Sequence, residues 1–469
     1  MPLKQFTTDF WELGRNESVR LWMPFVLPIL KYKYGKLVDF LSVYESGSRP
    51  KGGIKDEDEG EAISLGGEQI NIDGTVDLSS IPYVSYEFYE ESSKGKVEDS
   101  DILVCKDGAL TGKTCFIDFS IFPKKEVMVN EHIYILRGTR EVNQKFLFYF
   151  TTSNLFQSQV KDLAYKKKAQ PGLNFYHLGK IKIPIVSKPT QDKIVAQIEP
   201  IEKKIKELKN KITPPQEVIN KVFAREFKFD LKKFEELKKI KNYYLELSKF
   251  ADNRDIRQSV KFHREAGAFV ISQLKKITDK KIKHFLAEPI VLGKSVSPSN
   301  YDDNGDYFYV SMANIKNWKF EGEDCKLVSK EYSKENQNKI VAKNDILIAR
   351  SGEGTIGKVA LIDDEDLKGI FADFTMRIRL QNYDPLFAYY YFRTEYFQYL
   401  VEVNKKGLGN NTNIFPSQIQ EFPMIDISLK NQQKIVDEIK AELDAQEEMN
   451  QKIESERNKI DDIIENAIK

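Results

Sequence analysis

Apolar residues recur at steps of four and three in two stretches of the chain, which is the spacing of a helix face that packs against a partner helix. The first stretch covers residues 194–212, where Pro200 is expected to kink the helix or to start a new turn. The second lies near the C-terminus and is weaker, because Glu442 and Glu456 occupy positions that should be apolar. We expect the two helices to pair with each other. The predicted seam comprises Ile194, Ile198, Ile201, Ile205, Leu208, Ile212, Ile435, Ile439, Met449, Ile453 and Ile460.

Elsewhere the pattern changes to short runs of β-branched and aliphatic residues around glycine-rich turns. Residues 100–118 (SDILVCKDGALTGKTCFID) and residues 344–363 (NDILIARSGEGTIGKVALID) each contain two such runs and predict a hairpin. The aromatic-rich segments 145–160 and 387–401 are expected to be helical and largely buried. Each half of the chain therefore predicts a compact domain of mixed helices and strands.

The two hairpins belong to a repeat that extends over most of the chain. Asp101 and Asp345 are 244 residues apart, whereas Gly112 and Gly357 are 245 apart, so the second hairpin loop is one residue longer. A repeat of this length indicates two copies of a whole domain rather than a solenoid of short units. Other matching segments are 46–50 with 292–298, 64–70 with 309–315, and 165–199 with 405–440.

The predicted fold class is α+β, with two tandem β-rich domains separated by long helices that pair as an antiparallel coiled coil with pseudo-two-fold symmetry. At about 1.5 Å per residue, the apolar stretch of the first helix spans roughly 28 Å. DNA half-sites one helical turn apart are separated by a comparable distance of about 34–36 Å. The predicted segments are a first domain at 1–189, a central spacer helix region at 190–229, a second domain at 230–429 and a C-terminal spacer helix at 430–469.

Composition changes this picture only locally. The 72 basic and 71 acidic residues nearly cancel, but the lysine-rich segments 161–168 and 275–283 are each suited to binding phosphates. The three cysteines and four histidines form no metal-binding pattern, so we expect neither a disulfide framework nor a bound metal. The apolar run 21–30 is too short to span a bilayer and lacks the layout of a signal peptide. We therefore expect no membrane segment and a cytoplasmic location.

One motif resembles a nucleotide-binding loop. Gly352, Gly354 and Gly357 satisfy G-x-G-x-x-G, but that motif holds phosphate only where a helix follows the loop. Residues 359–363 (VALID) have the pattern of a strand, which favours a plain hairpin turn. No nuclease, methyltransferase or Ser/His/Asp pattern stands out from the charged background, so we expect a chain without catalytic residues.

In this order and in duplicate, the motifs resemble those of the specificity subunit of type I restriction–modification enzymes. The resemblance covers nearly the whole chain, although Lys106 replaces the arginine that is usual in the first hairpin, and residues 230–268 exceed the usual connection. The matching residues are 101–108 and 345–352 in the hairpins, Ile183, Pro184, Gln191, Ile194 and Val195 at the first spacer helix, and Phe422, Pro423, Gln432, Ile435 and Val436 at the second.

The resemblance implies that each globular domain is a target recognition domain for one half of a bipartite DNA site, with a non-specific gap set by the helices. Lysine, arginine and side-chain amides contact phosphates and base edges. We expect such groups in the hairpin loops, near residue 50 and in the polar loops of the repeat. The expected DNA-binding residues are Arg49, Lys51, Lys113, Lys166, Lys167, Lys168, Gln170, Asn174, Arg350, Lys358, Lys405, Lys406, Asn410, Asn411, Thr412 and Asn413.

The resemblance also implies the partners. Two methyltransferase subunits would dock on the helices, and two restriction or translocase subunits would join them on double-stranded DNA. S-adenosylmethionine, ATP and Mg²⁺ are expected in those subunits, and no cofactor is expected in this chain.

Three other functions fit parts of the pattern. The recognition subunit of a type IIB-like restriction enzyme would share the architecture but work with a partner that fuses nuclease and methyltransferase. A structural dumbbell would use the helices to separate two protein-binding domains and would not bind DNA. An enzyme acting on a nucleotide would use the glycine loops, and a nucleotide-binding assay tests it.

Overall fold

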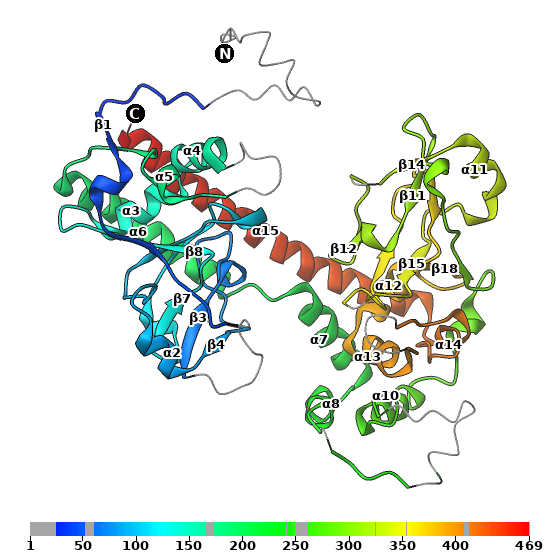
Figure 1. Ribbon diagram of the computed structural model, residues 1–469. Coiled ribbons are helices and arrows are strands. Elements are labelled where there is room, and N and C mark those ends of the chain that lie inside the picture. The colour runs from blue at the N-terminus through cyan, green and yellow to red at the C-terminus, as the bar shows by residue number, and fades with distance from the viewer. Residues whose placement is uncertain are drawn as a thin grey trace. The chain divides into compact units, whose positions relative to one another are not determined.

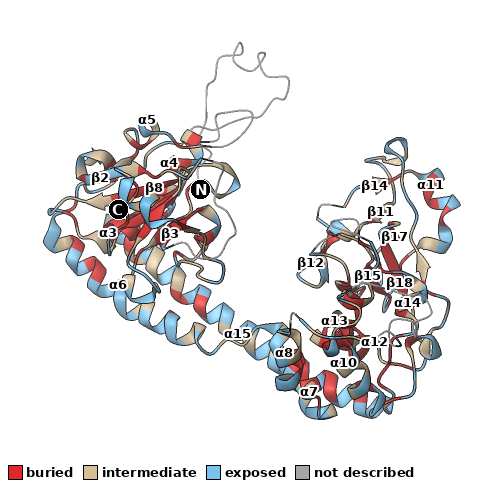
Figure 2. Cartoon of the chain, turned by 60° about the horizontal axis from the view of Figure 1, so that its bottom comes forward, coloured by how far each residue is buried: buried red, intermediate tan, exposed pale blue. Residues whose placement is uncertain are grey.

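The chain divides into two compact units, and each unit carries its own hydrophobic core. The first unit comprises Met1–Asn210 and Gln451–Lys469, and the second comprises Lys211–Asn450. Buried residues gather in the sheets and on the inner sides of the helices of each unit (Figure 2). The computed structural model describes residues 25–51, 61–164, 172–240, 242–246, 248, 260–323, 325–352, 354–407 and 412–468.

Two small sheets form the β-rich part of the first unit (Figure 1). One is antiparallel with the strand order β2-β8-β5-β6, and the other has the order β4-β3-β7, in which β3 and β7 are parallel. A separate two-stranded ribbon pairs β1 with β9. The strands are β1 (Tyr34–Lys36), β2 (Leu41–Ser46), β3 (Ala62–Leu65), β4 (Tyr83–Val84), β5 (Ile102–Cys105), β6 (Thr114–Phe116), β7 (Val127–Val129), β8 (Ile133–Gly138) and β9 (Lys182–Pro184).

Both faces of the antiparallel sheet are buried, because successive side chains of a strand point to opposite faces. Ile102 and Val104 pack in the cluster that contains α3 and α4, whereas Leu103 and Cys105 pack in the cluster that contains β3 and β7. Helices α3 to α6 gather on one side of this unit (Figure 1). The helices are α2 (Tyr86–Glu91), α3 (Gln144–Thr152), α4 (Asn154–Ala164), α5 (Phe175–Leu178) and α6 (Lys188–Lys209).

The second unit repeats this topology. Its antiparallel sheet has the order β10-β18-β15-β16, and its three-stranded sheet has the order β14-β11-β17 with β11 and β17 parallel. The strands are β10 (Val291–Leu292), β11 (Tyr307–Val310), β12 (Ile315–Lys316), β13 (Lys319–Phe320), β14 (Leu327–Val328), β15 (Ile346–Ala349), β16 (Val359–Leu361), β17 (Gly369–Phe371) and β18 (Thr375–Ile378). The helices are α7 (Pro215–Phe227), α8 (Leu231–Lys238), α10 (Glu265–Lys275), α11 (Lys330–Glu335), α12 (Pro385–Arg393), α13 (Glu395–Asn404), α14 (Pro416–Ile419) and α15 (Leu429–Ile468).

The predicted hairpins and the predicted duplication are confirmed. The runs around each glycine-rich turn pair as β5 with β6 and as β15 with β16. Each aromatic-rich segment is helical and buried as predicted, but it forms two helices rather than one. Ser153 and Thr394 separate the pairs, and each hydroxyl accepts a bond from the backbone N–H three residues later. These caps satisfy a free N–H at the start of the second helix.

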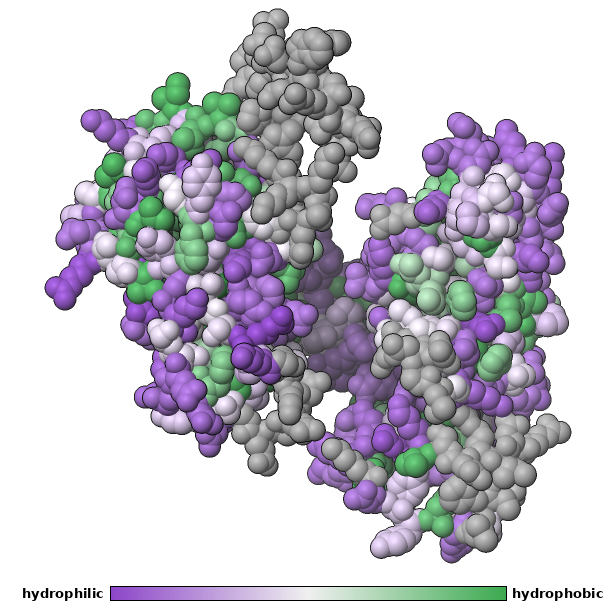
Figure 3. All heavy atoms as spheres, in the orientation of Figure 1, coloured by the Kyte–Doolittle hydropathy of each residue, from purple (hydrophilic) through white to green (hydrophobic). Residues whose placement is uncertain are grey.

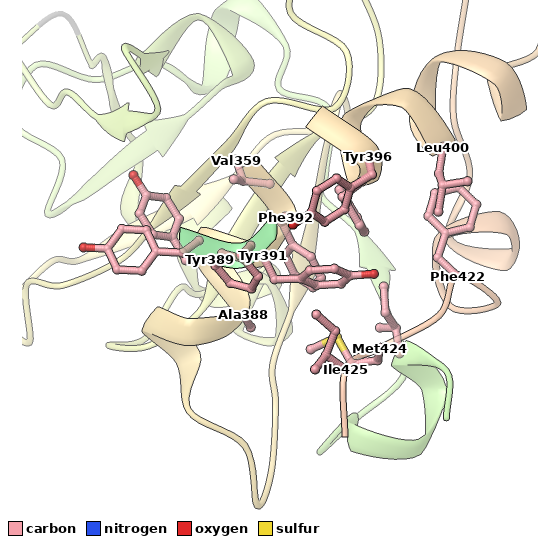
Figure 4. Close-up of a cluster of buried hydrophobic side chains, with 14 of the residues drawn as sticks. Val359, Ala388, Tyr389, Tyr391, Phe392, Tyr396, Leu400, Phe422, Met424 and Ile425 are labelled. Carbon is pink, nitrogen blue, oxygen red and sulfur yellow. The ribbon is translucent and has the colours of Figure 1, made fainter. Parts of the chain in front are cut away.

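Aromatic side chains dominate the core of the second unit (Figure 4). Tyr391 and Phe392 from α12 pack beside Tyr396 of α13, and Phe422 and Met424 close the cluster from the segment after α14. The hydroxyl of Tyr391 donates to the Pro423 carbonyl over 2.7 Å, so its one polar atom is satisfied within the apolar surroundings.

One buried glutamine fastens each spacer helix to its domain. Gln191 of α6 accepts a bond from the N–H of Asn143, and its amide donates to the Val186 carbonyl, both over 2.8 Å. Gln432 of α15 makes the same two bonds, to the N–H of Asp384 and the Ile427 carbonyl, again over 2.8 Å. The matching Q-x-K-I-V segments of the two copies therefore have a structural role. They tie the first turn of a spacer helix to the N-terminus of a core helix.

A buried ion pair also repeats. Asp101 receives two bonds from Arg137 of β8, over 2.7 and 2.8 Å, and Asp345 receives two from Arg379, directly after β18, each over 2.7 Å. Each carboxylate also accepts a backbone N–H, from Glu98 in the first copy. The aspartate of each D-I-L motif therefore stabilises its sheet through a buried ion pair. It is not available for contacts at a surface site.

In the first unit the predicted seams of α6 and α15 contact each other in antiparallel order, and in the second unit the segment that follows α6 meets α15 in the same sense. In the first unit, Ile464 packs in the cluster of Ile194 and Ile198, and Lys204 binds Glu456 over 2.6 Å. Residue numbers therefore increase along α6 where they decrease along α15, so the two helices run antiparallel. In the second unit, the N–H of Thr213 donates to Gln446 over 2.9 Å, and Arg225 binds Glu438 over 2.6 Å.

Two details of the seams differ from the predicted pattern. Helix α6 continues through Pro200 without a break, because Pro200 lies on the exposed side. Ile435 and Ile439 are buried in the aromatic core of the second unit, so this part of the seam serves the domain as well as the helix pair. In Figure 2 α6 presents buried residues on one side and exposed residues on the other. Among the described residues no helix is long and apolar enough to cross a bilayer.

Phe229 and the described parts of the long connection at residues 230–268 pack on the second domain. Phe229 stacks on Tyr396 of α13 with ring centroids 4.0 Å apart, and Phe234 meets Tyr399 edge-on at 5.2 Å. Lys261 binds Glu402 of α13 over 2.7 Å. Helices α8 and α10 therefore brace the helix that leads into the polar loop at residues 405–413.

The glutamine bonds predict a domain-specific loss of stability. Gln191→Ala leaves a buried N–H and a buried carbonyl without partners, and we expect it to lower the free energy of unfolding of the first unit by about 2–3 kcal/mol. Gln197→Ala, on the exposed side of α6, is the matched control and should change it little. Hydrogen exchange measured peptide by peptide in urea separates the two units. Equal protection in the two variants contradicts the assignment.

Candidate nucleic-acid interface

Each domain brings three loops together at one end of its antiparallel sheet. In the first domain, the backbone of Lys106 in the hairpin loop accepts a bond from Leu173 and donates one to His132, over 2.7 and 2.9 Å. In the second domain, Arg350 accepts from Ile414 and donates to Phe374, both over 2.9 Å. Because these bonds use only backbone atoms, the side chains at these positions are free to differ between the copies.

We call these loops the tip of each domain. The first tip comprises Lys106, Asp107, His132, Gly172 and Asn174, and the second tip comprises the equivalent residues Arg350, Ser351, Phe374, Asn413 and Phe415. The equivalence follows from the shared backbone bonds and from the matching bridges Asp107–Gly172 and Ser351–Asn413. All five pairs differ in residue type, and all but the basic pair Lys106/Arg350 also differ in chemical class, whereas the ion pair and the glutamine below them are the same.

The hairpin loop at each tip is held by packing and does not form a phosphate-binding loop. Gly112 has a φ of 90° and Gly357 a φ of 84°, which favour glycine. Their carbonyls accept bonds from Gln157 and Gln398, over 2.9 and 2.8 Å. A strand, not a helix, follows each loop. The prediction of a plain hairpin turn is confirmed.

Charged and titratable groups form a chain across the first tip. Arg49 binds Glu131 over 2.7 Å, and His132 lies between Glu131 and Asp107, at 3.4 and 3.0 Å. Arg49, which was predicted to bind DNA, is thus oriented by an acidic partner. No motif in the sequence singles out His132, Glu131 or Asp107 as site residues. Aligning the two copies of the repeat would have singled out His132 and Asp107, because the equivalent positions of the second copy hold residues of different chemistry.

Aromatic rings with high exposure lie beside this chain. Phe175 and Tyr176 of α5 are 49% and 68% exposed, and Tyr44 of β2 is 42% exposed. Phe175 meets Tyr134 edge-on with centroids 5.1 Å apart. Burial raises the pKa of Tyr134 to about 12, so its hydroxyl stays neutral. Large rings this exposed on a small domain indicate a surface that a partner covers.

The second tip is built around one arginine. Arg350 donates to the side chain of Asn413 over 3.3 Å and stacks on the ring of Phe415, 5.5 Å from its centroid. Its buried Nε has no hydrogen-bond partner in the described part of the chain. Phe374 and Phe415 are 46% and 36% exposed. The tip therefore presents a guanidinium oriented by Asn413 and Phe415.

The predicted lysines at the second tip differ in their surroundings. Lys405 binds Glu402, which also holds Lys261, each over 2.7 Å. Burial acts to raise the pKa of Glu402, but the bonds from both lysines lower it overall. Lys358 lines a cavity of about 300 Å³ that Lys405 and Arg393 also border. Lys406 is exposed, and its backbone pairs with Asn413.

The remaining predicted residues fall into three groups. Asn174 is exposed but its side chain caps α5, where it accepts the N–H of His177 over 2.9 Å. Lys51 is exposed, Lys113 is half-buried in the first hairpin loop, and Thr412 is buried. Six predicted residues lie outside the described residues. They are Lys166, Lys167, Lys168, Gln170, Asn410 and Asn411.

The ribbon of β1 and β9 continues from the first tip. Lys36 of β1 lies directly opposite Lys182 of β9. In the second domain the equivalent segments lie side by side and are antiparallel, with Lys281 paired with Pro423. There Glu421 binds both Lys281 and Lys283, each over 2.7 Å, and these bonds lower the pKa of Glu421 to about 2. The two domains therefore carry differently charged versions of one element.

The visible face of each unit is mainly hydrophilic, with apolar side chains scattered between charged ones (Figure 3). Among the described residues no three His, Cys, Asp or Glu side chains gather as metal ligands do. Cys105 and Cys115 are buried in the sheet, and burial raises the pKa of both thiols, that of Cys105 to about 12.

Comparison with known proteins gives one family. The model described as "Type I restriction modification DNA specificity domain" matches residues 30–214 and 286–456, which together exceed half of the chain. Each matched region contains one hairpin, one tip and one Asp–Arg pair. Residues 215–285, with α7, α8 and α10, lie between the matches. No curated protein sequence matches the chain.

Three of the solved structures that match the chain have TM-scores below 0.5. A chain from work on complex assembly and conformational transition of a type I R-M system is 12% identical, with a TM-score of 0.47, covering 95% of this chain and 99% of the other. The S subunit of a type I system from M. genitalium is 12% identical, with a TM-score of 0.41, covering 94% and 96%. The HsdS subunit from Thermoanaerobacter tengcongensis is 13% identical, with a TM-score of 0.31, covering 95% and 98%.

The Glu421 cluster predicts an unusual titration. A carboxylate whose pKa is lowered on folding adds stability above its unfolded value near 4.5, and this stability is lost as the pH falls through about 2. We expect the carboxyl carbon of Glu421 to titrate near pH 2 by NMR. In Lys281→Gln/Lys283→Gln the midpoint should return toward 4.5. An unchanged midpoint in the double variant would refute the assigned cause.

Proposed function

The chain belongs to the family of type I restriction–modification DNA specificity proteins, and we propose that its two domains read the two halves of a split DNA target. The observation that supports this most is the combination of one repeated scaffold with two different tips. The bonds that hold the fold are the same in both copies, from the Asp–Arg pair to the buried glutamine. The five tip positions differ at every pair. Two domains that recognise different DNA sequences need the same supporting bonds but different residues at their tips.

The second tip has the chemistry of a guanine reader. An arginine fork pairs with the O6 and N7 atoms of guanine in the major groove, the commonest specific contact of proteins to a base. Asn413 and Phe415 fix the guanidinium of Arg350 before DNA arrives. Fixing a side chain in advance lowers the entropy lost on binding. We assign Arg350 the role of reading a base in the second half-site.

The first tip offers different groups. Asp107 and Glu131 are acceptors of the kind that recognise the amino group of cytosine, and the exposed ring of Phe175 suits the methyl group of thymine. Lys113 and Lys358 occupy equivalent positions in the two hairpin loops and are identical. A residue shared by two readers of different sequences fits a contact to phosphate, which is the same in both halves.

The spacer helices are the proposed docking surface for two methyltransferase subunits. In the first unit the seams of α6 and α15 pack together, and the other sides of the two helices are exposed and charged. Two restriction subunits complete the proposed complex in the cytoplasm. S-adenosylmethionine, ATP and Mg²⁺ would be bound by those partners. The residues of this chain would hold and orient the DNA while the partners carry out methylation and cleavage.

Methylation sequencing tests the proposal directly. Genomic DNA is read at single-molecule level after expression of this chain with the methyltransferase encoded beside it, and again without this chain. We expect N6-methyladenine in a motif of two short blocks separated by a fixed gap, lost when this chain is omitted. A continuous motif, or one that persists without this chain, contradicts the proposal.

The tips predict which block each domain reads. Arg350→Gln should relax or change a position in one block and leave the other block intact, because loss of a bidentate base contact costs about 1–3 kcal/mol of discrimination. Asp107→Asn should alter only the other block. Arg140→Gln, an exposed change in the first domain away from its tip, is the control. Changes in both blocks from one tip variant would oppose the assignment.

A further inference from the structure

The ribbon of β1 and β9 holds an uncompensated group of lysines. Lys36 and Lys182 are directly opposite across the two strands, and Lys33 and Lys180 lie next to the strands. The alternation of the strand points Ile181 and Ile183 into the core, so Lys182 between them points outward. Lys33, Lys36 and Lys180 are exposed and Lys182 is half-buried.

Like charges placed directly opposite in a ribbon repel each other and destabilise the pairing. No ion pair joins Lys33, Lys36, Lys180 or Lys182 to an acidic side chain of the described chain. The repulsion between these lysines therefore lowers the stability of the folded domain, and no ion pair within the described chain offsets it. A ligand that supplies negative charge at this position would remove it.

The ribbon is continuous with the first tip. Lys180 lies over the exposed ring of Tyr176, with its Nζ 4.1 Å from the centroid, and Tyr176 is next to Phe175 of the tip surface. Gln159 of α4 bonds both the N–H and the carbonyl of Lys182, over 2.7 and 2.9 Å. A duplex that lies against Phe175 and Tyr176 would extend past Lys180 onto the ribbon.

The second domain shows the same element with its positive charge partly neutralised. Ile282 matches Leu37 in the sequence repeat, and both are fully buried. The lysines beside Ile282 are Lys281 and Lys283, and Glu421 binds both. Glu421 holds both ammonium groups over 2.7 Å. The second ribbon thus has less free positive charge to offer an anion than the first.

We propose that the β1–β9 ribbon of the first domain binds the sugar–phosphate backbone of DNA beside the first half-site, and that Glu421 prevents the equivalent contact in the second domain. This inference rests on the proposed function, because it places DNA on the first tip. Lysines act as point charges that suit phosphate rather than a base edge. The ribbon therefore adds affinity without adding sequence information. The two domains contribute unequally to binding, and the first grips the duplex more strongly.

The salt dependence of binding tests the proposal. The full-length chain is purified with its methyltransferase partner and titrated with a duplex carrying the split motif, at KCl concentrations from 50 to 300 mM. The slope of log K against log salt concentration is negative, and each phosphate contact contributes about −0.9 to it. We expect Lys36→Gln/Lys182→Gln to make the slope less negative by about 2. Lys94→Gln/Lys125→Gln, which removes the same charge from exposed positions beside α2 and β7, should leave it unchanged.

A gain-of-contact variant tests the second half. Glu421→Gln frees Lys281 and Lys283, and it should make the slope more negative and tighten binding several-fold at low salt. Methylation sequencing of each variant should give the wild-type motif, since the ribbon carries no base contact.

The outcomes separate the two proposals. A wild-type motif with an unchanged slope in the Lys36/Lys182 variant overturns the ribbon proposal and leaves the proposed function standing. Loss of the methyltransferase from that variant on gel filtration, with an unchanged slope, also overturns it and makes the ribbon a protein contact. No change in Glu421→Gln overturns the inhibitory role of Glu421. Absence of any split motif from the wild-type complex refutes the proposed function itself.

Discussion

The architecture depends on a buried side-chain amide that joins each spacer helix to a recognition domain. Gln191 and Gln432 each satisfy one N–H and one carbonyl that would otherwise be unpaired in an apolar environment. Unpaired polar groups in such surroundings are costly, so the geometry of the junction is narrowly defined. The N-terminus of a core helix is held against the first turn of the spacer helix in both copies. The orientation of each tip on its helix follows from this contact.

The tips show how a fixed fold carries different recognition chemistry. Their loops are attached through backbone bonds, such as those of Lys106 and Arg350, which any side chain at these positions would allow. The fold beneath uses side chains that do not change, the Asp–Arg pair among them. Stability and specificity therefore rest on separate sets of residues. An exchange at the tip changes what is read with little effect on the core.

Much of the fold was predictable because its signals are local or repeated. The hairpins follow from β-branched runs around glycines, and the seams follow from apolar spacing. The division of each aromatic segment into two helices was missed, because the caps at Ser153 and Thr394 are single hydroxyls. The site was harder to predict. Basic residues such as Arg350 were found by type, but His132 and Phe374 are brought to the tips only by tertiary pairing.

The two units are assembled from the chain in different ways. The second is one continuous segment, Lys211–Asn450, whereas the first combines Met1–Asn210 with Gln451–Lys469. Ile464, near the end of the chain, is part of the core that also contains Leu37. During synthesis the second unit has its full sequence available first, and domains generally fold as units. The core of the first unit therefore stays incomplete until the ribosome has synthesised the last turns of α15. A chain interrupted shortly before its end would therefore lose the integrity of its earliest-made domain.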